Sequence, residues 1–456
     1  MSFKLLEIGR AALVAAAICV VAVASPSYAA APVDGDEWAI GAGETETLDA
    51  AATISRLAVD GSLTLGAGAA LTANGAVVNC ISTGDGMVAD MTIASGASFA
   101  SQGNLTGANP GNTQGFSIGT YGGTGTVTVA SGGTLTVTGG RLFLGRNSLT
   151  DANGADRTKL SHGVLNIFGT VTAPTIECGA WFPMNASGTT YDLDALPVAS
   201  IINLEEGGVL EIGLFQNNDA SRNVINFKGG TLRLTREANP LVYASVSTIW
   251  NIEAGKSLVF DSQSYHANLN PAIHQPDSFK ITGAGGLVKK GTGYLRICMS
   301  HPEMNTFTGP IVVEEGYLSI GRPLAEGQTV LVKSGAVFYP VAPGDLSKIT
   351  YENPADAPAE GSVYAVHLPI YEGLDLLGMA PAYATDKIAT TTWGWNGEVH
   401  GAITHSPDIS REHPFGLVGQ GRTLTLDGTG LDGPLTVGEE KDMECWMPEC
   451  FSVSSS

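Results

Sequence analysis

Apolar and polar residues alternate in short runs along most of this chain, and the runs come in pairs. LAVDGSLTL from Leu57 shows the pattern, with two alternating apolar residues, a turn with glycine and two more apolar residues. Alternation with a period of two is typical of strands that bury one face. The same phrase recurs as MTIASGASF from Met91, VTVASGGTLTV from Val127, INLEEGGVLEI from Ile202, INFKGGTLRL from Ile225, WNIEAGKSLVF from Trp250, IVVEEGYLSI from Ile311 and VLVKSGAVFY from Val330.

One such pair of strands cannot bury its own apolar face, so successive copies must stack into a continuous core. The turn glycines are widely spaced at first and lie closer together later, as the series Gly61, Gly96, Gly132, Gly169, Gly207, Gly229, Gly255 and then Gly316 and Gly335 shows. This drift favours a parallel β-helix with variable loops over a strict-period repeat or a propeller. The sequence therefore predicts an all-β solenoid of ten to twelve coils, a rod on the order of 50 Å long at ~4.8 Å per coil.

Residues 1–29 have the pattern of an export signal. Lys4 and Arg10 make the start positive, Ala11 to Ala24 is an uninterrupted apolar run, and small residues end at Ala29. This arrangement suits a cleaved signal peptide better than a membrane anchor. We therefore expect no transmembrane segment in the mature chain and a location at the cell surface, outside the cell or in the periplasm.

Charge narrows the class of partner. The 456 residues include 44 Asp and Glu against 23 Lys and Arg, which gives a formal net charge of −21. A surface this acidic repels phosphate backbones, so nucleic acid is not an expected partner. The balance is compatible with neutral glycans, with divalent cations, or with simple solubility. Surface glycans or a host or cell-surface protein are the expected partners. No cofactor is expected.

Five cysteines follow the signal, and an odd number over this length is not a disulfide framework. Cys445 and Cys450 are close enough for a small local loop in an oxidising compartment. Cys80, Cys178 and Cys298 lie in or beside strand phrases, where we expect buried small hydrophobic residues.

The pattern changes after Val341. Seven prolines interrupt the alternation between residues 343 and 414, and only Leu424–Leu426 and Leu435–Val437 look like a further strand pair around a glycine-rich turn. We interpret residues 30–340 as the β-helix and residues 341–456 as an irregular cap or a small β module.

The most specific stretch runs from Phe279 to Ile320. It contains a G-x-G-G-L-x-K-x-G-x-G-x-L-x-I run from Gly283 to Ile297, an N-x-F-T-G turn from Asn305, and Val313, Gly316, Leu318 and Ile320 in the strands that follow. This stretch resembles the autotransporter-associated β-strand repeat of bacterial passenger regions. The resemblance implies a right-handed parallel β-helix that is exported and displayed at the cell surface, and it implies no catalytic residues.

The chain departs from that family in two ways. Extra residues around Ser300 to Met304 precede the turn, and no series of amphipathic strands for a translocating barrel follows Val341. The resemblance therefore supports fold and export better than self-secretion.

Three motif matches for catalysis or nucleotide binding fail on context. Gly115–Gly119 fits G-x-S-x-G, but a glycine-rich segment follows where a nucleophile elbow needs a helix. Gly428–Gly433 fits G-x-G-x-x-G, but Pro434 and a strand follow it. Gly255-Lys256-Ser257 resembles the end of a phosphate loop, and its neighbours make it a β-turn.

Acids and histidines give two weaker candidates. Glu398, His400, His405, Asp408, Glu412 and His413 cluster in sequence without a recognised zinc spacing, so a solvated loop is the favoured interpretation. Parallel β-helices can also carry glycan-cleaving carboxylates on one face. The acids near the coil turns that could form such a face are Glu205, Glu206, Glu211, Glu253, Glu314 and Glu315.

The leading hypothesis is an exported β-solenoid that acts as a structural or adhesin-like surface protein, without catalytic activity or a metal site. The alternative is a β-helix that binds or cleaves carbohydrate, and a third interpretation is a partial passenger with no independent activity. Trp181, Trp393 and Trp395 are the candidate ligand contacts, because aromatic rings stack on sugar faces.

Overall fold

The computed structural model describes the solenoid and six short strands that follow it in the chain. The described residues are 32, 35–75, 78–102, 115–120, 122–138, 140–146, 161–179, 198–217, 222–238, 241–244, 248–269, 279–297, 304–340 and 348–356, with 389–393, 397–400, 415–419, 423–427, 435–437 and 452–455 in the C-terminal region.

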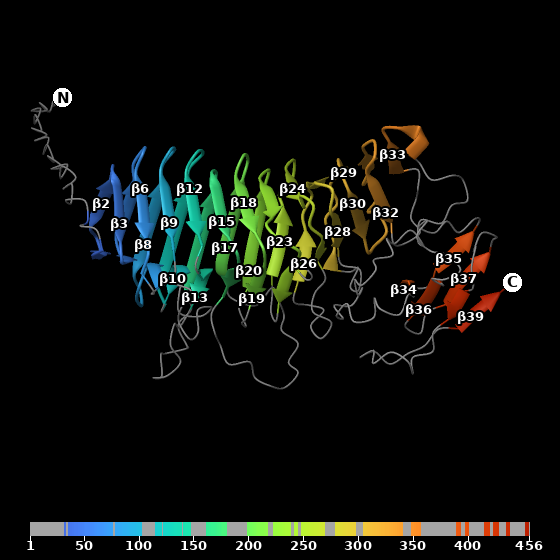
Figure 1. Ribbon diagram of the computed structural model, residues 1–456, viewed down its shortest axis with the longest axis horizontal. Helices are drawn as coiled ribbons and strands as arrows, with labels where there is room; N and C mark the ends of the chain where they lie inside the picture. The colour runs from blue at the N-terminus through green and yellow to red at the C-terminus, as the bar shows by residue number, and fades with distance from the viewer. Residues whose placement is uncertain are drawn as a thin grey trace, which may run out of the picture.

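Three long parallel sheets form the body of the molecule, and each coil from β1 to β22 adds one strand to each sheet (Figure 1). Sheet A consists of β1 (Glu37–Ile40), β4 (Arg56–Val59), β7 (Val78–Ile81), β10 (Gly115–Thr120), β13 (Arg141–Arg146), β16 (Ile176–Cys178), β19 (Phe215–Asn217) and β22 (Val242–Ala244). Sheet B consists of β2 (Thr45–Leu48), β5 (Ser62–Leu65), β8 (Val88–Ile93), β11 (Thr124–Val129), β14 (His162–Ile167), β17 (Val198–Glu205), β20 (Arg222–Lys228), β23 (Thr248–Ile252) and β26 (Phe279–Thr282).

Sheet C is the longest sheet, and it runs through the whole solenoid. Its strands are β3 (Ala51–Ile54), β6 (Ala70–Ala73), β9 (Ser98–Ser101), β12 (Thr134–Val137), β15 (Thr170–Ala173), β18 (Val209–Ile212), β21 (Thr231–Leu234), β24 (Ser257–Asp261), β27 (Gly286–Lys290), β29 (Ile311–Val313), β31 (Val330–Val332) and β33 (Ile349–Tyr351). The number of strands in this sheet, twelve, agrees with the expected number of coils. At ~4.8 Å per strand the sheet has a length on the order of 50 Å.

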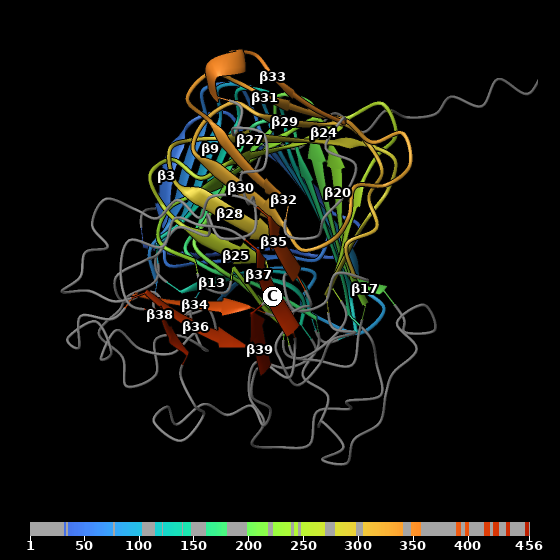
Figure 2. The same cartoon turned by 90° about the vertical axis from the view of Figure 1, so that its right-hand side faces the viewer.

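The coil changes its cross-section towards the C-terminal end. Sheet A ends at β22 and sheet B at β26, whereas a fourth sheet starts beside them and continues with sheet C. This sheet D consists of β25 (Ala267–Leu269), β28 (Tyr294–Ile297), β30 (Tyr317–Ile320) and β32 (Val337–Pro340). The last coils therefore contain two strands instead of three. Figure 2 gives the view along the stack, in which successive strands of each sheet lie behind one another.

The inward residues of every coil form one continuous apolar core. In β11 and β14 every second residue is buried and the residues between them are half-buried or exposed, as a period of two requires. The core contains a cluster of four aromatic rings in which Trp250 packs edge-on against Phe215, Phe227 and Phe279, with ring centroids 5.1 to 5.8 Å apart. Aromatic side chains bury large apolar areas, so this cluster stabilises the middle coils.

The fold class predicted from the phrases is confirmed: the chain is all-β, with long parallel stacked sheets. The phrases, however, are not all the same part of a coil. The copy from Leu57 joins sheet A to sheet B, the copies from Met91 to Trp250 join sheet B to sheet C, and those from Ile311 and Val330 join sheet C to sheet D.

The region after Val341, which we expected to be an irregular cap or a small β module, contains β-strands in two places. β33 extends sheet C to Tyr351, with a short 3₁₀ turn at Pro354–Asp356. Further on, β34 (Ala389–Trp393), β36 (Phe415–Gly419) and β38 (Leu435–Val437) form one small parallel sheet, and β35 (Gly397–His400), β37 (Thr423–Asp427) and β39 (Ser452–Ser455) form another. The strands expected around Leu424 and Leu435 exist, but they belong to different sheets and do not pair.

No helix in the described part of the chain is long and apolar enough to span a bilayer.

Candidate functional site

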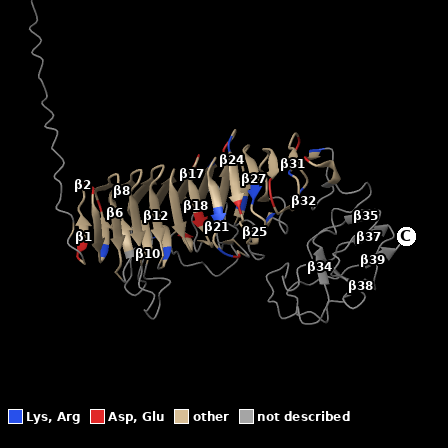
Figure 3. Cartoon of the chain, turned by 45° about the horizontal axis from the view of Figure 1, so that its top comes forward, with Lys and Arg blue, Asp and Glu red and all other residues tan. Residues whose placement is uncertain are grey.

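A row of alternating charges follows the outer face of sheet C along its C-terminal half (Figure 3). Because parallel strands stack in register, outward residues of successive coils form straight columns. We name this one the charge column. In order along the rod it contains Glu211, Arg233, Asp261, Lys290, Glu314, Lys333 and Glu352.

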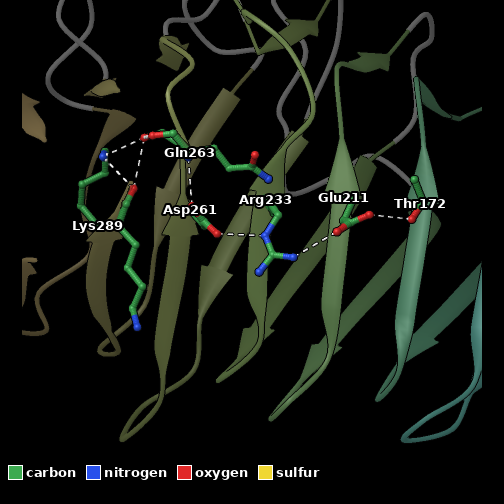
Figure 4. Close-up of polar contacts among 8 residues, drawn as sticks. Thr172, Glu211, Arg233, Asp261, Gln263 and Lys289 are labelled. Atoms are coloured by element: carbon green, nitrogen blue, oxygen red, sulfur yellow. Dashed lines mark hydrogen bonds and ion pairs between the residues drawn. The ribbon is translucent and has the colours of Figure 1, made fainter. Parts of the chain in front are cut away.

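Neighbouring members of the charge column pair with each other. Arg233 lies 3.1 Å from Glu211 and 2.9 Å from Asp261, and it bridges two coils (Figure 4). Lys290 lies 3.1 Å from Glu314, and Lys333 lies 2.8 Å from Glu352. The column is thus a ladder in which each charge has an opposite charge on an adjacent coil.

Electrostatics favours the ionised forms of two members of the column, Arg233 and Glu352. Hydrogen bonds to Asp261 and Glu211 raise the pKa of Arg233, and the bond from Lys333 lowers the pKa of Glu352. A group held in its ionised form is poorly suited to proton transfer near neutral pH. The column is therefore suited to holding coils in register rather than to acid–base chemistry.

A second column, on the outer face of sheet B, consists of amides. Asn251 donates to Asn226 at 3.1 Å, Asn226 to Asn203 at 3.0 Å, and Asn203 to Asn166 at 2.8 Å. The Asn166 amide donates in turn to Thr128 Oγ1 at 3.2 Å. We name this continuous chain of five side chains the asparagine ladder.

Lys289 is a charged side chain within the core. It is fully buried, and its ammonium group donates to the carbonyl oxygens of Lys290 and Gly291 at 2.8 and 2.7 Å. Ser262 Oγ lies at 2.9 Å and the Glu315 carbonyl at 3.3 Å. Burial lowers the pKa of Lys289 to about 8. The side chain satisfies backbone carbonyls at the corner between sheets C and D.

Buried polar and charged side chains lie on the outer side of sheet A. Arg141 donates to Glu177, which is buried, and the Arg146 guanidinium lies 4.2 Å from the centre of the Phe143 ring. Phe116 and Ile118 face the core, so Ser117 between them lies on the outer side of the strand. Ser117 is nevertheless buried. Burial also raises the pKa of Cys80 and of Cys178 to about 12, so neither described thiol is reactive.

The candidate ligand tryptophans are not brought together in the described part of the chain. Trp393 ends β34, where only the backbone is described, and Trp181 and Trp395 lie outside the described residues. Their role in ligand contact stays a prediction.

The acids expected near the coil turns do not share one face. Glu205 pairs with Lys228 on sheet B at 2.8 Å, and Glu206 pairs with Lys256 at the turn at 2.8 Å. Glu211 and Glu314 belong to the charge column on sheet C. Three of these carboxylates pair with cations on adjacent coils and Glu206 pairs with a cation two coils away, which is unlike a pair of catalytic carboxylates flanking a bound sugar.

The G-x-S-x-G match is not a nucleophile elbow. Gly115 to Gly119 lies within β10, a strand paired on both sides with β7 and β13. The Gly255-Lys256-Ser257 match is the expected turn, since Gly255 has a φ of +74° between β23 and β24.

Metal-binding candidates fall mostly outside the described residues. Of the six candidates, only Glu398 and His400 lie on a described strand, β35. The G-x-G-x-x-G match at Gly428–Gly433 also lies outside the described residues. No cluster of His, Cys, Asp and Glu that could hold a metal ion occurs among the residues that the structure does describe.

Neither column was predicted from the sequence, although the repeated phrases contain a signal for the asparagine ladder. Asn166, Asn203, Asn226 and Asn251 each stand between the last two apolar residues before the turn, as in LNI, INL, INF and WNI. Equal positions in the phrase become neighbours on the rod, so the ladder could have been found by aligning the copies.

No protein-family model matches the chain, and no curated protein matches it either.

Proposed function

We propose that this chain is an exported β-solenoid that acts as a structural or adhesin-like surface protein without catalytic activity. The observation that carries the proposal is the pairing of the coil acids. Glu205, Glu211 and Glu314 each pair with a cation on an adjacent coil, so they strengthen the stack instead of facing a substrate. The export part rests on the basic, apolar and small-residue pattern of residues 1–29.

The test uses the purified chain with a panel of neutral and acidic polysaccharides, with and without Ca²⁺. New reducing or unsaturated chain ends are measured over time. We expect none. Formation of new ends that is abolished by substitution of the coil acids, for example Glu253→Gln or Glu315→Gln, would contradict the structural role and favour a polysaccharide-cleaving β-helix.

Export is tested separately by expression with and without residues 1–29, followed by cell fractionation and exposure of intact cells to an external protease. Surface protein that disappears on protease treatment supports display. Retention of the full-length chain in the cytoplasm would contradict export.

A further inference from the structure

The N-terminal end of the solenoid, at the left of Figure 1, is the end of three sheets at once. β1, β2 and β3 are the first strands of sheets A, B and C, and each pairs with a strand on one side only. Within the described part of the chain, the segment before β1 adds two backbone bonds to the end of β3. Gly35 donates to the Thr53 carbonyl, and the Asp36 carbonyl accepts from Ser55. Edge strands are templates for pairing with another chain, and proteins that avoid such pairing protect them.

The inward residues of these three strands form the end of the apolar core. Trp38 of β1 is in register with buried Leu57, and Ala52 of β3 is in register with buried Leu71. Trp38 is half-buried and packs against the core. A further coil stacked on this end would bury the rest of the Trp38 ring and lengthen the core by one layer. The hydrophobic effect alone would therefore favour the addition of a second copy at this end.

One inward position of this first coil is an acid. Glu46 of β2 is in register with Leu63 of β5, which is fully buried, and it stands two residues before inward Leu48. Glu46 is half-buried. As far as β26, the same inward column contains only buried apolar residues: Leu63, Met91, Val127, Leu165, Ile202, Ile225, Trp250 and Ile281. The Glu46 carboxylate thus stands where each of these later coils has a hydrophobic side chain.

A carboxylate at this position opposes the addition of another coil. A strand stacked on β2 would cover Glu46 and remove its charge from water, which is unfavourable unless a cation is buried with it. The other inward residues of the coil supply no cation, since they are Trp38, Ile40, Leu48, Ala52 and Ile54. An inward-pointing charge on an end strand is one of the ways in which sheet proteins prevent edge-to-edge association.

The cross-section of the rod selects the surface that could stack here. The first coil has three strands, whereas the last coils have two, which belong to sheets C and D. The N-terminal end of a second copy is therefore the matching surface. A contact between two identical surfaces is isologous and closes as a dimer, and this one would bring two Glu46 carboxylates into the same interface.

We propose that Glu46 prevents the N-terminal end of the solenoid from stacking on the same end of a second copy. The carboxylate opposes the burial that Trp38 and the other inward residues of the first coil would otherwise favour. The inference goes beyond the proposed surface role, because it identifies what limits assembly at this end of the rod.

The test measures the molar mass of the purified chain by light scattering over a range of concentrations, for the wild type, Glu46→Leu and Thr47→Leu. Thr47→Leu is the matched control, because it introduces the same side chain at the next, outward position of β2. Thermal melting and circular dichroism confirm that each variant is folded. Glu46→Val replaces Glu46→Leu if the leucine variant does not fold.

We expect Glu46→Leu to reach about twice the mass of the wild type as the concentration rises, and Thr47→Leu to keep the wild-type mass. Addition of Trp38→Glu to Glu46→Leu restores an acid to the end and should return the mass to that of the wild type. A folded Glu46→Leu chain with the wild-type mass would overturn the inference. Equal association of the Thr47→Leu control, or association that Trp38→Glu leaves intact, would overturn it as well.

Discussion

At the scale of the residue, Lys289 explains why a lysine can occupy a core position. Its stem packs with inward apolar residues of sheet C, and its ammonium group reaches four oxygen atoms at the corner between sheets C and D. A buried ammonium without partners would be strongly destabilising. With these partners, the side chain joins the carbonyl groups of two neighbouring corners.

This arrangement predicts a pH-dependent contribution to stability. The pKa of Lys289 is about 8 in the folded chain and has the ordinary value of 10.5 when unfolded. Between these values the unfolded state binds more protons, so this group makes the free energy of unfolding rise as pH increases from 8 to 10.5. Relative to Lys289→Met, the wild type should gain about 2 kcal/mol between pH 7.5 and 10.

Urea denaturation of both proteins at pH 7.5, 9 and 10 measures this difference. Groups that titrate alike in both proteins, including Tyr294 and the two buried cysteines, cancel in the comparison. A difference that stays constant with pH would show that Lys289 keeps its ordinary pKa.

At the scale of the element, stability depends on contacts between equivalent positions of successive strands. Surface ion pairs contribute little singly, but a shared partner makes the loss of one member larger. Arg233 is such a partner, since it bridges β18 and β24 through Glu211 and Asp261.

We therefore expect Arg233→Met to lower the free energy of unfolding by about 1 kcal/mol, because two carboxylates lose their common cation. Lys333→Met removes a single, more exposed pair and should have a smaller effect. Denaturation at low and high salt measures both, and the Arg233 effect should shrink at 1 M NaCl. Equal effects of the two variants would contradict the bridging role.

Corner glycines differ in what they tolerate, although all look alike in the phrases. Gly255 and Gly283 both have positive φ, +74° and +109°. A Cβ on Gly255 would meet nothing within 4 Å, whereas one on Gly283 would lie 2.1 Å from the Ile252 carbonyl oxygen. Gly255→Ala should cost about 1 kcal/mol of stability through backbone strain alone.

Gly283→Ala should cost several times more, because the backbone of the neighbouring coil must move to make room. Melting temperatures of the two variants, with circular dichroism to confirm β structure, measure the contrast. Similar losses for both would mean that the coil spacing relaxes readily at this corner.

The sequence pattern was sufficient for the strands and their stacking, because inward alternation around Leu57 or Ile225 is a local property. It was insufficient to predict which corner of the coil each turn occupies. Gly61 and Gly316 have the same local signature, yet one joins sheet A to sheet B and the other joins sheet C to sheet D. Which corner a turn occupies depends on coils far away in the sequence, so the irregular spacing could not be assigned from the phrases alone. The pairing of Glu211 with Arg233 was hidden for the same reason.

At the scale of the whole molecule, each coil contacts only its neighbours, so stability is a sum along one axis. Strands in the middle of sheet C pair on both sides, whereas β3 and β33 pair within that sheet on one side. Local opening should therefore be easiest at the ends.

Native-state hydrogen exchange tests this expectation. Buried amides of β15 and β18 should exchange at least about tenfold more slowly than those of β3 and β33, because opening a middle strand breaks two sets of contacts. All the compared strands belong to sheet C. Uniform exchange across all twelve strands would indicate all-or-none unfolding.

The loss of sheets A and B before the end of sheet C also gives the rod a mechanical character. A beam resists bending in steep proportion to its thickness, and the coils of this one contain three strands from β1 to β28 and two strands from β29 to β32. Under a load perpendicular to the rod axis, the thick section would stay straight and the bending would concentrate in the thin section. The asparagine ladder lies on the thick section, so it would keep its geometry while the narrow section bends.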